Sequence, residues 1–458
     1  MIHIDTTLQP HDLLPHMTAL WSLSAEKILS LRKTWDAPRG APVFTVKGEY
    51  TSRGWTEWTQ GFQSGSALLQ FDATGEKEFL EYGKYETIAH MAPHLSHTGV
   101  HDHGFNNVST YGNLLRLMRE GKIPEQVWEK NFYELALKVS GAVQAARWTA
   151  LSANEGYIYS FNGPHSLFAD TMRSLRSLAL AHQLGQTLMA EHDKKINLLE
   201  RLLQHANATS RYNVYFGEGR DIYDVRGRVA HEAIFNLNDK TYRCQNSQQG
   251  YSPFSTWTRG SAWILLGFAE ELEFLASLHE KEFPADFEKS KMLELVLHTA
   301  EAVADFYITQ TPTDGVPYWD TGAPLLFKSG DYLNRPANPF NDFEPVDSSA
   351  AVIAAQGFLR LGNYLHDKGK MEDGIKYLQT GLTIARTVFN EPYLSTDSKH
   401  QGLILHSVYH RPNGWDYIPA GKNVPCGESS MWGDYHAREL ALMIQRMAGK
   451  EVYYRFYL

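Results

Sequence analysis

Hydrophobic positions recur with a helical period along almost the whole chain. Apolar residues spaced at i, i+3, i+4 and i+7 predict twelve amphipathic or buried helices. We expect them near residues 10–35, 58–73, 76–91, 102–120, 124–149, 165–186, 190–207, 257–278, 284–309, 346–366, 369–389 and 428–447. Alternating patterns typical of strands are short and confined to the region around 211–243. The pattern therefore predicts an all-α protein with small β pieces in long loops.

The connections between these helices are of two kinds. Short ones, such as Ala73-Thr-Gly75 and Gly121-Lys-Ile-Pro124, join successive helices into hairpins. Long ones, at 208–256 and 310–345, are rich in Gly, Pro, Asn, Asp and Tyr. Loops of this length in a compact protein are usually functional or carry small β pieces.

Every second helix, counted from the second, begins with polar and aromatic residues, whereas the helices between have ordinary solvated faces. These six starts are Trp58-Thr-Gln-Gly-Phe62, His101-Asp-His-Gly-Phe105, Phe168-Ala-Asp-Thr-Met172, Trp257-Thr-Arg-Gly-Ser-Ala-Trp263, Asp347-Ser-Ser-Ala350 and Ser430-Met-Trp-Gly-Asp-Tyr435. The alternation predicts a closed ring of six helical hairpins whose inner helices begin at one mouth. Free amides and positive dipole ends would converge there. Since no linker of disordered composition interrupts the pattern, we expect one domain over residues 1–458.

Composition excludes several classes of protein. The 458 residues include 43 Lys and Arg against 52 Asp and Glu, a formal charge of −9 without a basic block, which argues against a nucleic-acid or anionic-membrane surface. Cys244 and Cys426 are too few for a disulfide framework and form no CxxC pair. No apolar run approaches the ~18 residues of a membrane span. The first ten residues lack a basic and an apolar signal region, so a cytoplasmic location is expected, or a periplasmic one if a signal peptide was removed.

Aromatic residues make up 12% of the chain, which also contains 20 His. Aromatic faces and titratable groups suit sugar binding and proton transfer. Trp58, Trp257 and Trp263 could therefore face a ligand, although aromatics at helical spacing more often belong to the core. Arg259, between the last two, could hold a carboxylate in a bidentate fork or form a buried ion pair with Asp347.

Asp102 and Asp170 each fall in the opening turn of an apolar helix. A single Asp at such a position is usually a cap or a dipole partner. Two of them on neighbouring inner helices could instead repel each other and lose solvation, which keeps one protonated near neutrality. A carboxylic acid held in this way can donate a proton and then act as a base.

Other kinds of site have weaker support. The cluster of His94, His97, His101 and His103 lacks the spacing of a metal motif, so we expect no metal. His231, in a polar loop, would on its own be a surface residue. The chain contains neither a Gly-rich phosphate loop in a βαβ unit nor a GxSxG nucleophile motif.

Several ordered motifs resemble those of a known family. Gln249-Gly-Tyr-Ser252 followed by Trp257 to Trp263 resembles the hallmark segment of unsaturated glucuronyl hydrolases, glycoside hydrolase family 88. The resemblance continues, in the order of the family, through His101–Phe105, Asp170-Thr-Met172, Asp314-Gly-Val-Pro-Tyr-Trp-Asp320, Asp347–Ala351, Ser407-Val-Tyr-His410 and Trp432-Gly-Asp-Tyr435, and covers roughly residues 50–447. It implies an (α/α)6 barrel, in agreement with the hairpin count.

The resemblance also implies an unusual reaction. Polysaccharide lyases leave a C4=C5 double bond in a terminal uronic acid, and these hydrolases hydrate that enol ether, so that the sugar ring opens and releases the neighbouring sugar. Asp170 matches the general acid/base that protonates C4 and helps water to add at C5. Asp102 matches a second essential carboxylate that orients substrate hydroxyls and raises the pKa of its partner. His101 adjoins Asp102 in the same pattern and is expected to support it. The sugar-contacting positions correspond to Trp58, His231, Gln249, Arg259, Trp263 and Tyr409. No metal or organic cofactor is implied, and the expected partner is a small oligosaccharide.

Three alternatives remain open at this stage: an unsaturated rhamnogalacturonyl hydrolase, a sugar-binding barrel without turnover, and a sugar epimerase that uses a His pair. The segments Asn106–Gly112 and Lys328–Glu344 depart from what shorter family members lead us to expect. They leave the identity and sulfation of the neighbouring sugar open, and the sequence does not indicate an oligomeric state.

Overall fold

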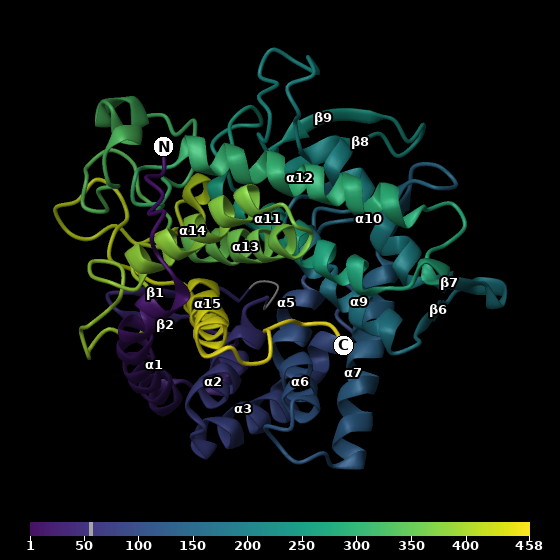
Figure 1. The fold of residues 1–458 in the computed structure, drawn as a ribbon, viewed down its shortest axis with the longest axis horizontal. Coiled ribbons are helices and arrows are strands. Elements are labelled where there is room, and N and C mark those ends of the chain that lie inside the picture. The colour runs from purple at the N-terminus through teal and green to yellow at the C-terminus, as the bar shows by residue number, and fades with distance from the viewer. Residues whose placement is uncertain (55–57) are drawn as a thin grey trace.

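The computed structural model describes residues 1–54 and 58–458, and helices dominate it. An inner ring is formed by α2 (Gln60–Thr74), α5 (His103–Asn107) with α6 (Asn113–Arg119), α8 (Thr171–Ser174) with α9 (Arg176–Gln183), α11 (Thr258–Ser277), α13 (Ser348–Asp367) and α15 (Met431–Gly449). Each of these segments packs against the next, and α15 returns to α2, which closes the ring (Figure 1).

An outer layer of helices covers the ring. It consists of α1 (Leu14–Thr34), α3 (Lys77–His90), α7 (Val127–Ala146), α10 (Leu198–Asn213), α12 (Lys289–Gln310) and α14 (Met371–Val388). Along the chain, outer and inner helices alternate, and each outer helix packs on a neighbour in the ring. This arrangement is the (α/α)6 barrel that the sequence predicted. A short helix, α4 (Ala92–Leu95), and a π-helical turn at Val108–Gly112 complete the region around α5.

All twelve predicted helices are present, but several boundaries are shifted; the helix expected at 284–309, for example, begins at Lys289. The helix expected at 165–186 begins only at Thr171, because Ser166–Phe168 pairs as a strand with Glu232–Phe235. The helix expected at 190–207 covers Leu198–Asn213 instead. The side-chain oxygen of Asn197 accepts a hydrogen bond from the Leu199 amide at 2.9 Å and caps the helix there.

The prediction that β structure is confined to 211–243 was wrong. The strands are β1 (Phe44–Val46), β2 (Glu49–Thr51), β3 (Trp148–Ala150), β4 (Gly156–Ile158), β5 (Ser166–Phe168), β6 (Thr187–Met189), β7 (Lys195–Asn197), β8 (Glu232–Phe235) and β9 (Tyr242–Asn246). β5, β8 and β9 form one antiparallel sheet in that order, and the others pair as hairpins. Most of these strands are three residues long, too short for an alternating pattern to be recognised.

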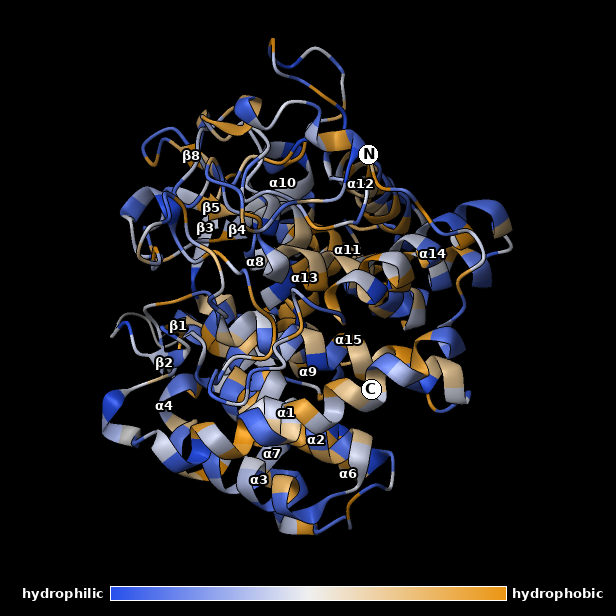
Figure 2. Cartoon of the chain, turned by 90° about the vertical axis from the view of Figure 1, so that its left-hand side faces the viewer, coloured by the Kyte–Doolittle hydropathy of each residue, from blue (hydrophilic) through white to orange (hydrophobic). Residues whose placement is uncertain are grey.

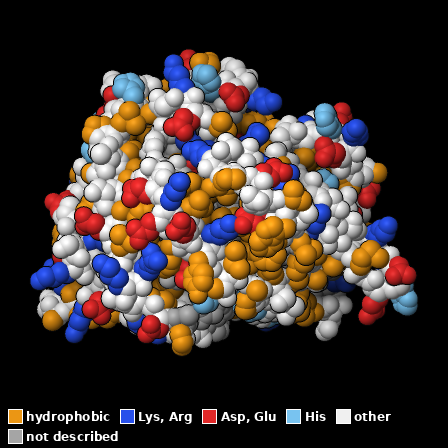
Figure 3. All heavy atoms as spheres, turned by 90° about the horizontal axis from the view of Figure 1, so that it is seen from below, with side chains coloured by type: hydrophobic (Ala, Val, Ile, Leu, Met, Phe, Trp, Pro, Cys, Tyr) orange, Lys and Arg blue, Asp and Glu red, His pale blue; other side chains and the backbone are white. Residues whose placement is uncertain are grey.

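The core lies where the inner helices meet. α11 and α13 are buried along most of their length, and hydrophobic colouring gathers around them in Figure 2. The outer helix α3, by contrast, buries only one side. On the face drawn in Figure 3, acidic and basic side chains are interspersed around a hydrophobic patch. Among the described residues, no helix is long and apolar enough to cross a membrane.

Candidate active site

A pocket opens where several inner helices begin, as the sequence predicted. It is lined by Trp58, His101, Asp102, Phe105, Phe161, Asp170, Gln248, Gln249, Trp257, Arg259, Trp263, Tyr409, His410 and Trp415. These residues come from the starts of α2, α5, α8 and α11 and from the loops that precede them or cover the mouth. Of the predicted site residues, only His231 is not part of this lining, and it lies directly behind Asp170.

The two carboxylates are not ordinary helix caps. Asp102 and Asp170 occupy the N-cap positions of α5 and α8, but neither side chain accepts a hydrogen bond from its helix. Both residues are buried. A buried carboxylate that does not cap its helix must find its partners elsewhere, and in this site the partners are histidines.

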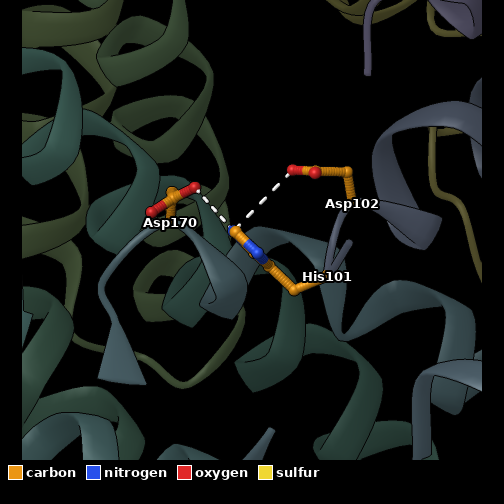
Figure 4. A group of neighbouring side chains, drawn as sticks. All are labelled: His101, Asp102 and Asp170. Carbon is orange, nitrogen blue, oxygen red and sulfur yellow. Dashed lines mark hydrogen bonds and ion pairs between the residues drawn. The ribbon is translucent and has the colours of Figure 1, made fainter. Parts of the chain in front are cut away.

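His101 lies between the two carboxylates (Figure 4). Its Nε2 atom is 3.1 Å from Oδ2 of Asp170 and 3.8 Å from Oδ1 of Asp102. Phe161 stacks near its imidazole ring, and the edge of Phe168 packs against it. A single nitrogen therefore faces both acids inside an aromatic enclosure.

The charges of this group are strongly coupled. Burial alone would raise the pKa of the Asp170 carboxyl, but the hydrogen bond from His101 and the nearby imidazole of His231 hold that pKa well below its usual range. Burial, together with the charge of Asp170, raises the pKa of Asp102 despite the opposing effect of His101. Burial would lower the pKa of His101, yet the charges of Asp102 and Asp170 raise it, with Arg147 opposing them.

These shifts correct one expectation. Asp102 was expected to raise the pKa of its partner and so keep Asp170 protonated. The imidazoles of His101 and His231 instead favour the charged form of Asp170 and lower its pKa. The pKa of His101 and that of Asp102 are both raised above their usual values. The two acids therefore differ in pKa, as predicted, but Asp102 has the raised pKa and Asp170 the lowered one.

His231 is buried, so it is not the surface residue that its loop alone would suggest. It immediately precedes β8, between Phe168 and Trp257. Its Nδ1 atom accepts hydrogen bonds from the backbone amides of Gln248 and Gln249 at 3.1 and 3.3 Å. Because Nδ1 is an acceptor, the ring proton of the neutral imidazole sits on Nε2. That atom points at Oδ1 of Asp170, 3.7 Å away.

Arg259 forms the buried ion pair with Asp347 that was one of its two predicted interpretations, at 2.9 Å. The same guanidinium donates to the side chain of Gln249 at 3.0 Å and to the carbonyl of Tyr409 at 2.7 Å. Arg259 therefore ties together two predicted sugar-contacting residues while it lines the pocket itself. Its role as a fork for a substrate carboxylate stays a prediction.

Aromatic rings form the walls of the pocket. Trp58 stacks on Trp432 with a centroid distance of 5.0 Å, and Trp263 packs against Phe105 at 4.9 Å. Tyr409 packs against Trp415 at 5.3 Å. Flat apolar walls beside buried acids suit a planar sugar ring.

Five residues that line the pocket were not predicted from the sequence: Phe105, Phe161, Gln248, His410 and Trp415. Phe105 and His410 lie inside the motifs that carried the resemblance, so the motifs could have identified them. Phe161 and Trp415 lie in irregular loops without any periodic pattern. Only the folded arrangement brings them to the mouth.

The site also has a spacing that could hold a metal ion. One ligand atom each from His101, Asp102 and Asp170 lies within 4.8 Å of the others. Of the four clustered histidines noted in the sequence, only His101 belongs to this group. His94 bonds to Asn106, and His103 bonds to Ser140 and to the carbonyl of His97.

Known proteins resemble this chain over most of its length. No family model matches it. An unsaturated glucuronyl hydrolase from Bacillus sp. strain GL1 is 25% identical over 401 residues, which cover 85% of this chain and 87% of the relative. Another, from Formosa agariphila, is 23% identical over 386 residues, with 84% and 78% covered.

The fold agrees with this similarity. The crystal structure of the unsaturated glucuronyl hydrolase from Bacillus sp. GL1 superposes with a TM-score of 0.68 and 22% identity, covering 93% of this chain and 97% of that one. The (α/α)6 barrel and the predicted resemblance to unsaturated glucuronyl hydrolases are therefore both confirmed.

Proposed function

We propose that this protein hydrolyses oligosaccharides that end in a 4,5-unsaturated uronic acid, by hydrating the C4=C5 double bond and releasing the neighbouring sugar. The observation that carries this proposal is the pair of buried, non-capping carboxylates bridged by His101 in an aromatic pocket. The similarity to unsaturated glucuronyl hydrolases supports the same reaction.

The reaction begins with a proton. His101 passes its Nε2 proton to Asp170 across the 3.1 Å contact, and Asp170 delivers that proton to C4. The C4=C5 electron pair forms the new C–H bond, and positive charge develops at C5 and on the ring oxygen. The carboxylate of Asp170 then accepts a proton from water as the water oxygen bonds to C5. The resulting hemiketal opens, and the neighbouring sugar leaves with its glycosidic oxygen.

The other residues bind and orient the substrate in this proposal. Asp102 accepts hydrogen bonds from sugar hydroxyls, and Trp58 and Trp263 hold the planar ring. Gln249 and Tyr409 contact the uronate, positioned by Arg259. His231 holds Asp170 from the side opposite His101. The substrate is the only partner that this chemistry requires. In this proposal residues 1–458 act as one catalytic domain, in the cytoplasm or, if a signal peptide was removed, in the periplasm.

The proposal is tested by incubating the protein with unsaturated disaccharides and following the ultraviolet absorbance of the double bond. We expect the absorbance to fall as the neighbouring sugar is released. Unchanged absorbance across several linkages and sulfation patterns would refute the reaction. If wild type and Asp170→Asn then bind the disaccharide equally well, the alternative of a binding barrel without turnover would stand.

The nature of the neighbouring sugar is a second question. The Bacillus enzyme of similar fold is described as responsible for the degradation of glycosaminoglycan. This favours glycosaminoglycan fragments over the pectin fragments taken by unsaturated rhamnogalacturonyl hydrolases. Comparing kcat/KM on chondroitin-, heparin- and rhamnogalacturonan-derived disaccharides separates the two, and a preference for the last would reverse the assignment.

A further inference from the structure

A network of buried polar side chains lies one helical turn behind the two acids. It consists of Gln144 on α7, Ser174 at the end of α8 and Ser177 on α9, which we call the polar clamp. None of the three lines the pocket, and all are fully buried. Polar groups in such a position need an explanation beyond packing, because apolar residues would fill the same space without a desolvation penalty.

The polar clamp forms hydrogen bonds with the backbone on either side of Asp102. The Ser174 hydroxyl donates to the carbonyl of His101 at 2.6 Å and accepts from the amide of Gly104 at 2.8 Å. The Gln144 amide nitrogen donates to the same carbonyl and to Ser174 Oγ, both at 2.9 Å. The Ser177 hydroxyl donates to the remaining oxygen of Gln144, which fixes the orientation of that amide. The single proton and both lone pairs of Ser174 are thus in use.

Gly104 lets the two inner helices approach closely enough for these bonds. A Cβ atom at this position would lie 2.1 Å from the carbonyl oxygen of Ser174. Asp102 precedes Gly104 by two residues, and Asp170 precedes Ser174 by four. The crossing of α5 and α8 therefore sets how far apart the two acids stand, and the bonds to the His101 carbonyl set where the imidazole points between them.

We propose that Ser174 and Gln144 are positioning residues that hold the His101 imidazole in register with Asp170 and Asp102. This role rests on the proposed function, because the register matters only if a proton passes between these groups. Proton transfer depends on donor and acceptor distances within a narrow range, so a small shift of the His101 backbone slows the chemical step. Substrate binding is affected far less, since the polar clamp does not reach the pocket.

The experiment compares Ser174→Ala with Ser140→Ala. Ser140 is an equally buried serine on α7, but its hydroxyl bonds to Asn107 and His103 and does not contact His101. We expect kcat of Ser174→Ala to fall about 10- to 100-fold with KM changed less than about twofold. Ser140→Ala should keep the kcat of wild type even if its Tm falls by a similar amount. Gln144→Met, which removes the second donor, should repeat the kcat effect.

A second measurement does not depend on turnover. The titration of the His101 imidazole, followed by NMR of histidine-labelled protein, should move in Ser174→Ala and Gln144→Met and stay in place in Ser140→Ala. If wild type fails to turn over any unsaturated disaccharide, the proposed function falls while this titration still tests the positioning. Equal kcat and an equal His101 titration in wild type and Ser174→Ala would overturn the proposal, as would a parallel loss of kcat in Ser140→Ala.

Discussion

Two groups of buried charges inside the same ring are organised in opposite ways. Deeper in the ring, Arg173 pairs with Glu439 at 2.9 Å and with Glu270 at 3.0 Å, and Arg360 pairs with Glu273 at 2.7 Å. There each cation faces at least one anion. At the mouth, the imidazole of His101 faces both carboxylates, and that of His231 faces Asp170 alone.

The difference separates structural charges from reactive ones. In the deeper cluster, tyrosines of the C-terminal segment complete the pairing, since Tyr453 donates to Glu273 and Tyr454 to Glu439. None of these residues lines the pocket, so a proton in the deeper cluster cannot pass directly to a ligand. At the mouth, His101 and the two acids are buried to a similar degree but line an open pocket. Buried charges away from the pocket stabilise the fold, whereas buried acids that line the pocket are placed for proton transfer to a ligand.

The largest effect should follow from removing the reactive acid. Asp170→Asn keeps the shape of the side chain but can no longer carry a proton to C4. We expect kcat to fall about 10²- to 10⁴-fold, with circular dichroism and Tm close to those of wild type. A variant that retains more than a tenth of wild-type turnover would show that another group protonates the substrate.

The complementary change is made in the deeper cluster. Glu439→Gln removes one of the two carboxylates that face Arg173 and leaves Glu270 as the other. Breaking a buried pair destabilises a protein by up to about 3–5 kcal/mol. Denaturant unfolding should show this loss, while kcat per folded molecule stays within about twofold of wild type. A loss of kcat comparable to that of Asp170→Asn would remove the distinction between the two groups.

The pH dependence provides a finer test. The pKa of His101 is raised above its ordinary value of 6.5, so its proton persists to higher pH than that of a solvated histidine. Activity that uses this proton is therefore present at lower pH and is lost as pH rises through the raised pKa. In His101→Gln this alkaline limb of the kcat profile should disappear, with lower activity throughout. An unchanged limb would assign it to another group, such as Asp102.

The smallest expected effect concerns metals. His101, Asp102 and Asp170 are close enough together to hold an ion, but the proposed steps use only protons. Dialysis against a chelator should leave kcat/KM unchanged, and adding back divalent cations should not increase it. Activity that is lost with the chelator and restored by one cation would show that these residues hold a metal during turnover.

Most of the helices could be predicted from the sequence because their apolar patterns extend over many residues. Helices such as α11 and α13 repeat their apolar positions over several turns. The hairpin β6–β7 was missed because three-residue strands carry too little pattern. The motifs also placed Asp102, Asp170 and Trp263 at one mouth. The sequence could not show that the pKa of Asp170 is lowered, since this shift depends on contacts from His101 and from His231, which lie far from it along the chain.

The central claim is that a buried acid hydrates a double bond and does not cleave the glycosidic bond directly. The most direct test records double-bond absorbance and release of the neighbouring sugar in one reaction with wild-type protein. Hydration predicts that both change together at equal initial rates, and that both rates collapse in Asp170→Asn. Release of the neighbouring sugar while the absorbance persists would mean attack at the anomeric carbon, and would contradict the account.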